Sequence, residues 1–88
     1  MAKVIWEAAA SREMDRLANK EPKAIGPIVE FIYGPLSDNP ARVGALLTRE
    51  LEGMYRATRG TYWILYTFDE AEIHIEYVGH RNEVYRTR

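Results

Sequence analysis

The sequence predicts an α+β domain, with a helical hairpin packed on a small antiparallel sheet in the order β-α-α-β-β-β. Apolar residues recur at the helical spacing of three and four in the first part of the chain. From residue 50 onward apolar and polar residues alternate, which is typical of half-buried strands. A stretch rich in glycine and proline, residues 34–40, separates the two halves. A chain of 88 residues has room for one domain, so residues 1–88 are expected to fold as a single unit.

The first half is expected to contain one short strand and two helices. Residues 3–6 are β-prone and form the predicted strand. Residues 8–19 are predicted as a helix, because three alanines precede apolar residues at helical spacing. Residues 22–33 form the second predicted helix, and Pro27 is expected to kink it or delay its start. The apolar stripe of this second helix consists of Ile25, Ile28, Val29, Ile32 and Tyr33.

The second half is expected to form three strands in a meander. After a connector at residues 42–48, strands are predicted over residues 50–58, 62–68 and 73–78. Side chains alternate between the two faces of a strand, and the helices are expected to cover only one face of the sheet. In the first of these strands, Tyr55 and Ala57 are predicted on one face and Arg56 and Thr58 on the other. In the second strand, Ile64 and Tyr66 share one face, and Trp63 and Leu65 share the other. In the third strand, the residues on one face are Ile73, Ile75 and Tyr77, and those on the other are His74, Glu76 and Val78.

Composition excludes several classes of function. The chain contains no cysteine, which rules out disulfides, thiol catalysis and thiolate metal sites. The spacing of its two histidines is a weak metal signal, so no metal or other cofactor is expected. The glutamate at position 7 comes too early for a secretory signal peptide, and no apolar run approaches the roughly 20 residues that span a bilayer. A cytoplasmic protein without a membrane partner is therefore expected.

The charge balance argues against a simple nucleic-acid binder, because such proteins are usually basic. The sequence has 12 Lys and Arg against 13 Asp and Glu, which gives a net charge of -1. The charges are unevenly distributed, however. Residues 54–61 hold arginines and no acid, residues 81–88 hold arginines and a single acid, and four acids gather between positions 69 and 76. The sequence therefore predicts a local basic site on a neutral or acidic body.

The arginines that border the last strands suit phosphodiester chemistry. A guanidinium stays charged and its planar fork matches phosphate oxygens, so Arg56 and Arg81 are candidates for binding a scissile phosphate. Cleavage of RNA by its own 2′-hydroxyl also needs a proton acceptor and a proton donor. Tyr85 and His80 can serve if their pKa values are shifted. The alternatives are that the arginines only confer solubility, that Tyr85 covers the apolar face of the sheet, and that His80 only holds a turn.

The same segments resemble the RelE/ParE toxin superfamily. Its members carry a Gly-x-Tyr-Arg-x-x-Tyr strand and a Gly-His-Arg-x-x-Val-Tyr segment, which correspond to residues 60–66 and 79–85 here. The resemblance covers residues 42–86 well, and in the helical half it is one of pattern and length. It implies the fold described above.

The resemblance also implies roles for individual residues. It puts Arg56 and Arg81 at the active surface, where Arg81 would hold the scissile phosphate. Tyr85 corresponds to the tyrosine that stacks on the reacting nucleotide or helps to deprotonate it. His80 would contribute a proton near neutral pH, and Arg86 would add an RNA contact.

Two positions depart from the family pattern. Trp63 stands where the family has its strand arginine, and Thr58 stands where a second basic residue is common. An indole cannot stabilise charge on a phosphate as arginine does, although it can stack on a nucleobase. Arg59 is adjacent to Thr58, but a shift of one residue directs it to the opposite face unless the turn bends it back. Arg59 and Trp63 are therefore predicted as RNA contacts beside a weakened or rearranged catalytic site.

The function that the resemblance implies is that of the toxin in a type II toxin–antitoxin system. Such a toxin is a metal-independent endoribonuclease that cuts mRNA in the ribosome, and a cognate antitoxin neutralises it in a hetero-oligomer. Two alternatives stay open, a ParE-like inhibitor of DNA gyrase and a toxin-fold module that only binds and co-represses. The antitoxin could occupy a groove of apolar residues, unless these are ordinary core: Trp6, Ile25, Ile28, Ile32 and Leu36.

Overall fold

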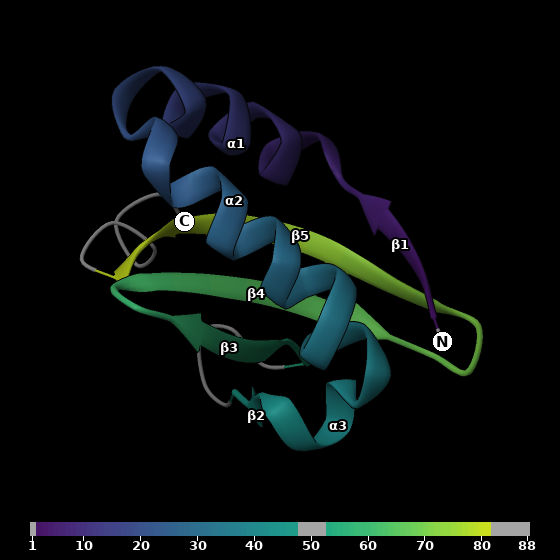
Figure 1. Cartoon of the computed structure of the whole chain (residues 1–88). Helices are drawn as coiled ribbons and strands as arrows, with labels where there is room; N and C mark the ends of the chain where they lie inside the picture. The colour runs from purple at the N-terminus through teal and green to yellow at the C-terminus, as the bar shows by residue number, and fades with distance from the viewer. Residues whose placement is uncertain (1, 48–52, 82–88) are drawn as a thin grey trace.

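The computed structural model describes residues 2–47 and 53–81, and its five-stranded sheet carries the helices on one face (Figure 1). The strand order is β1-β5-β4-β3-β2. The predicted α+β class, with a helical hairpin packed on a sheet, is confirmed. The elements along the chain are β1 (Lys3–Trp6), α1 (Ala8–Lys20), α2 (Pro22–Phe31), the π turn η1 (Ile32–Leu36), α3 (Pro40–Val43), β2 (Ala45–Leu46), β3 (Tyr55–Arg59), β4 (Tyr62–Phe68) and β5 (Glu72–His80).

One edge of the sheet departs from the antiparallel pattern. β1 runs parallel to β5, with Val4 beside Ile73, while the other neighbouring strands are antiparallel. A tight turn joins antiparallel neighbours, but β1 and β5 are separated by most of the chain and are free of that constraint. The expectation of an antiparallel sheet therefore holds for the strands from β5 to β2 and is corrected at the β1 edge.

The second helix continues through Pro27, and η1 then extends it. The proline removes one backbone donor, whereas continuing the helical turn buries Ile28, Ile32 and Leu36, each at most 1% exposed. The hydroxyl of Ser37 donates a hydrogen bond to the carbonyl of Ile32, 2.6 Å away, at the end of η1. Burial of the apolar stripe thus outweighs the missing bond at the proline. None of the helices in the described part of the chain is long and apolar enough to cross a membrane.

The core lies between the helices and the covered face of the sheet. Because Ile28, Ile32 and Leu36 belong to it, they are ordinary core and not a groove for a partner. Trp6 and Ile25 are partly buried. The fully buried residues that the sheet adds are Ala57, Ile64, Tyr66, Ile73, Ile75 and Val78.

Tyr66 fixes the segment of α3 and β2 to the sheet. Its buried phenol donates a hydrogen bond to the carbonyl of Pro40, 2.5 Å away, and burial raises the pKa of Tyr66 to about 12. A Cβ added at Gly44 would collide with this hydroxyl and with the carbonyl of Arg56. β2 therefore stays paired with β3 beside Arg56. The sequence predicts only a connector at residues 42–48, because such short elements show no periodicity.

A bulge in β5 changes which side chains lie on each face. Next to Leu65 of β4 the register shifts, so that Leu65 pairs with Tyr77 and Glu76 is an extra residue. Val78 thereby reaches the core, where it is 1% exposed, and Tyr77 turns to the opposite face. The predicted faces of Tyr77 and Val78 are wrong, because an extra residue reverses the alternation beyond it.

Candidate functional site

The face of the sheet that the helices leave uncovered, called here the open face, carries two rows of side chains across β3, β4 and β5. Residues within one row are direct cross-strand neighbours, whose Cβ atoms lie about 4.5–5.5 Å apart. We call both rows together the central patch. The first row is Arg56, Leu65 and Tyr77, and the second row is Thr58, Trp63 and Gly79.

Arg56 and Trp63 stack on each other within the central patch. The Cζ atom of Arg56 lies 4.6 Å from the centroid of the Trp63 ring. The Nε atom of Arg56 is buried and has no hydrogen-bond partner among the described residues. A guanidinium over an indole gains about 0.5–1 kcal/mol at an exposed site and about 2 kcal/mol when desolvated. The structure therefore brings two of the predicted site residues into direct contact.

Tyr77 belongs to the central patch although no sequence motif marks it as a site residue. Its ring lies over Gly79, where an added Cβ would stand 2.8 Å from Cε2 of Tyr77. Its hydroxyl is buried and finds no hydrogen-bond partner in the described part of the chain. A glycine inside a strand often marks a close approach of another group. Gly79 is therefore the sequence signal that could have indicated an aromatic ring packed on this face. The bulge that turns Tyr77 to this face leaves no pattern in the sequence.

Arg81 comes directly after β5, two residues beyond Gly79 of the central patch. Its backbone N–H donates a hydrogen bond to the carbonyl of Thr61, 3.0 Å away, which extends the pairing of β4 with β5. β5 ends at His80, and Arg81 itself has helical conformation, so strand alternation does not extend to its side chain. Its side chain is exposed. The structure thus fixes the backbone of Arg81 beside the β3–β4 turn, two residues beyond Gly79 in the row that contains Trp63.

His80 lies on the other side of the sheet. It pairs with Tyr62, and the two rings meet edge to face with centroids 5.9 Å apart. Both line a cavity of about 290 Å³ beneath α1, together with Arg16 and Lys20. The side chains of Arg56 and His80 are therefore separated by the sheet, and the structure does not bring His80 to the central patch.

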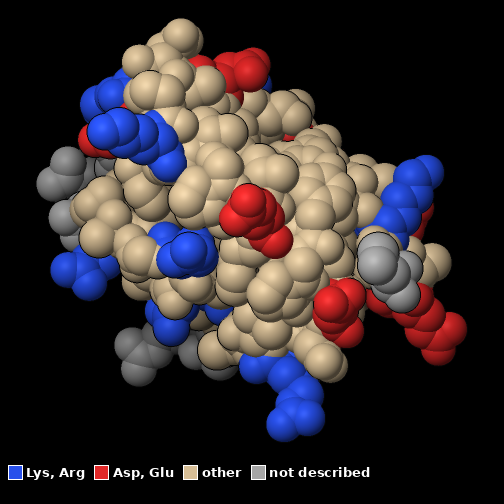
Figure 2. All heavy atoms as spheres, viewed as in Figure 1, with Lys and Arg blue, Asp and Glu red and all other residues tan. Residues whose placement is uncertain are grey.

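The remaining predicted site residues fall in two groups. Arg59 is exposed and pairs with Tyr62 at the end of β3, which puts it on the helix-covered side, as expected from its offset of one residue. Tyr85 and Arg86 lie outside the described residues. On the helix-covered side, acidic and basic side chains are interspersed (Figure 2).

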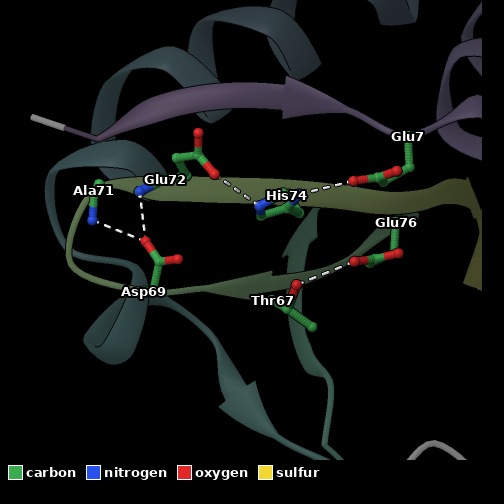
Figure 3. Close-up of polar contacts among 7 residues, drawn as sticks. All are labelled: Glu7, Thr67, Asp69, Ala71, Glu72, His74 and Glu76. Carbon is green, nitrogen blue, oxygen red and sulfur yellow. Dashed lines mark hydrogen bonds and ion pairs between the residues drawn. The ribbon is translucent and has the colours of Figure 1, made fainter.

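The open face becomes acidic toward the turn between β4 and β5 (Figure 3). Nδ1 of His74 lies 2.7 Å from Oε2 of Glu7, and Nε2 of His74 lies 3.2 Å from Oε1 of Glu72. The hydroxyl of Thr67 donates a hydrogen bond to Oε2 of Glu76, 3.0 Å away. No group of three or more His, Cys, Asp or Glu within the described ranges is arranged to hold a metal ion. The charges of this face are therefore separated along the strands, with Arg56 away from the acids near the turn.

The His74 cluster predicts a pH-dependent contribution to stability. The hydrogen bond from His74 to Glu7 raises the pKa of the imidazole above its usual value of 6.5. The contribution is therefore complete below about pH 6.5 and is lost as the pH rises through the pKa of the folded state. Urea unfolding followed from about pH 5 to about pH 8.5 should show stability falling with pH in this window. The variant His74→Gln should lack that slope, and a slope that survives in it would contradict this assignment.

Comparison with known proteins agrees with the fold. The chain is 40% identical over 85 residues to toxin RelG of Mycobacterium tuberculosis, covering 94% of each chain. It is 38% identical over 81 residues to toxin RelE of the same organism, covering 90% of this chain and 80% of that toxin. It also matches a chain in the crystal structure of the toxin–antitoxin complex RelBE2 from M. tuberculosis, with a TM-score of 0.81, 39% identity and coverage of 91% of this chain and 98% of that one. No protein-family model matches the chain.

A helical hairpin on one face of a mixed sheet is the fold of the RelE-like toxins. The identity to the two mycobacterial toxins extends over nearly the whole chain. The chain belongs to the RelE family of toxins.

Proposed function

We propose that this protein is the toxin of a type II toxin–antitoxin pair and that it cleaves mRNA in the ribosome. The observation that supports this most strongly is the arginine-bearing open face. Arg56 is stacked on that face, and the backbone N–H of Arg81 is hydrogen-bonded to the carbonyl of Thr61 at the end of the same pair of strands. Acidic side chains gather near the β4–β5 turn. The part of the open face that is suited to a polyanion is therefore the part that carries Arg56.

The reaction is an attack by the 2′-oxygen of the RNA on the adjacent phosphorus. A P–O2′ bond forms, the P–O5′ bond breaks, and the products carry a 2′,3′-cyclic phosphate and a 5′-hydroxyl. The attacking hydroxyl loses a proton to a base and the leaving oxygen gains one from an acid or from solvent water, and both transfers can take place without a metal. In this proposal Arg56 and Arg81 offset the charge that builds on the phosphate, and Tyr85 stacks on the nucleotide or removes its proton.

Partners follow from the same proposal. A cognate antitoxin holds the protein in a hetero-oligomer, as supported by the similarity to a chain of the RelBE2 toxin–antitoxin complex. The ribosome and its mRNA are the targets in the cytoplasm. A net charge of -1 gives weak steering toward RNA, so the ribosome supplies most of the orientation, and activity on free RNA is expected to be low.

Induced expression followed by primer extension on a reporter transcript tests the proposal. Cuts should appear inside translated codons and should disappear in Arg81→Ala, because this variant loses a phosphate-binding guanidinium. Arg16→Ala is the matched control, since Arg16 is an exposed arginine on α1 that pairs with Glu13. Its cuts should equal those of the wild type. Growth arrest with intact transcripts would contradict the nuclease proposal.

A second function is favoured by one observation, the tryptophan at the position of the family's strand arginine. A protein that has lost this arginine could act as a ParE-like gyrase inhibitor. In that case the expression experiment gives growth arrest, intact transcripts and altered plasmid supercoiling. Absence of a growth effect, with antitoxin binding retained, would instead indicate a co-repressor module.

A further inference from the structure

We infer that Trp63 is a positioning residue, whose indole holds the guanidinium of Arg56 in place on the open face for contact with an RNA phosphate. The inference rests on the proposed function and deepens it. It gives the departure from the family pattern a role, because the tryptophan at the position of the missing arginine contacts the arginine that remains.

The geometry of the central patch supports this role. Cζ of Arg56 is 4.6 Å from the indole centroid, although the two residues are in different rows. Trp63 faces the small side chain of Thr58 across the strands, which leaves room for the arginine to lie diagonally over the ring. Leu65, which is 4% exposed, forms the apolar floor next to both residues. The direction of the Arg56 side chain is therefore fixed by its packing on Trp63 and Leu65 as well as by its charge.

An indole is suited to hold an arginine that must bind a phosphate. A carboxylate would fix the guanidinium through hydrogen bonds, but it would also neutralise the charge and occupy the donors that the phosphate needs. The π face attracts the cation without using any N–H donor. Because Nε is buried, the terminal nitrogens are the ones that remain for a bidentate contact with phosphate oxygens.

A double-mutant cycle tests the coupling of the two residues in ribosome-dependent cleavage. Trp63→Leu should lower kcat by about 10-fold, which corresponds to about 1.4 kcal/mol, with little change in KM. In an Arg56→Ala background the same substitution should cost less than about 2-fold, because no guanidinium is left to position. Trp63→Tyr should restore most of the rate, since a phenol ring also attracts a cation. Equal costs in both backgrounds would overturn the inference and would assign Trp63 a direct contact with RNA.

A spectroscopic readout separates this inference from the proposed function. In the wild type, the Nε–Hε resonance of Arg56 should be shifted by the ring current of the indole, and Trp63→Leu should return it to the position of a solvated arginine. Trp6→Phe is the matched control and should leave the resonance unchanged, because Trp6 instead donates a hydrogen bond to Tyr33. The same resonance should respond to added inorganic phosphate at lower concentration in the wild type than in Trp63→Leu. An unshifted resonance, or identical phosphate titrations, would overturn the inference whether or not RNA is cleaved. A shifted resonance in a protein that cuts no RNA would count against the proposed function alone.

Discussion

Replacing Arg56 by alanine should lower the single-turnover rate of mRNA cleavage on programmed ribosomes by about 10²–10³-fold. On the proposed function the loss is large, because the variant removes the donor that we propose to face the developing phosphate charge in a partly dehydrated site. Stability should fall by no more than about 0.5–2 kcal/mol, the contribution of the stacking on Trp63, since the buried Nε of Arg56 has no hydrogen-bond partner among the described residues and its removal leaves no new unpaired group. The measurement is the cleavage rate at saturating toxin, with thermal unfolding of the same preparations.

Arg42→Ala is the control for this prediction. Arg42 is exposed in the last turn of α3 and lies outside the central patch. Its replacement should leave the cleavage rate within about 2-fold of the wild type, because surface substitutions of this kind have small effects. Equal losses in the two variants would show that only overall charge matters and would contradict the role given to Arg56.

Tyr66→Phe should lower the free energy of unfolding by about 1–3 kcal/mol, because the carbonyl of Pro40 loses its donor in a buried setting. For a domain of this size each kcal/mol corresponds to about 4–8 °C in Tm. Tyr66 is 0% exposed, and its hydroxyl holds α3 and β2 against the sheet. Denaturant unfolding and calorimetry measure the effect.

Tyr33→Phe is the matched control for Tyr66→Phe. It removes the same hydroxyl from a side chain that is 50% exposed, where water can replace the hydrogen bond with Trp6. Its cost should be below about 0.5 kcal/mol. A similar cost for both variants would contradict the anchoring role of Tyr66. The role matters for function, because β2 pairs with β3 beside Arg56.

The parts of the site that depend on turn chemistry and strand alternation could be predicted from the sequence. The turn between β3 and β4 contains Gly60 with φ of 65°, a conformation that glycine adopts readily in two-residue hairpin turns. This turn fixes the register that pairs Arg59 with Tyr62. Alternation along the two strands then puts Arg56 and Trp63 on one face and Arg59 on the other.

Other parts of the site depend on interactions that no local pattern records. Tyr77 reaches the open face through a bulge at Glu76. The alternation of residues before and after Glu76 along the chain does not reveal that one extra residue is inserted there. The stacking of Arg56 on Trp63 is diagonal and requires the actual positions of both side chains. His80 follows the strand alternation to the helix side, so its sequence position next to Arg81 is a poor guide to its place in the site.

The most direct test of the account uses mRNA with a single 2′-deoxy nucleotide at a mapped cleavage position, bound to programmed ribosomes. We predict that the protein cuts the unmodified message to give a 2′,3′-cyclic phosphate and a 5′-hydroxyl, and that the 2′-deoxy message stays intact at that position. Cleavage of the 2′-deoxy message at an undiminished rate, or an unmodified message that stays intact while growth is arrested, would contradict the claim that Arg56 and Arg81 serve the cleavage of RNA by its own 2′-hydroxyl.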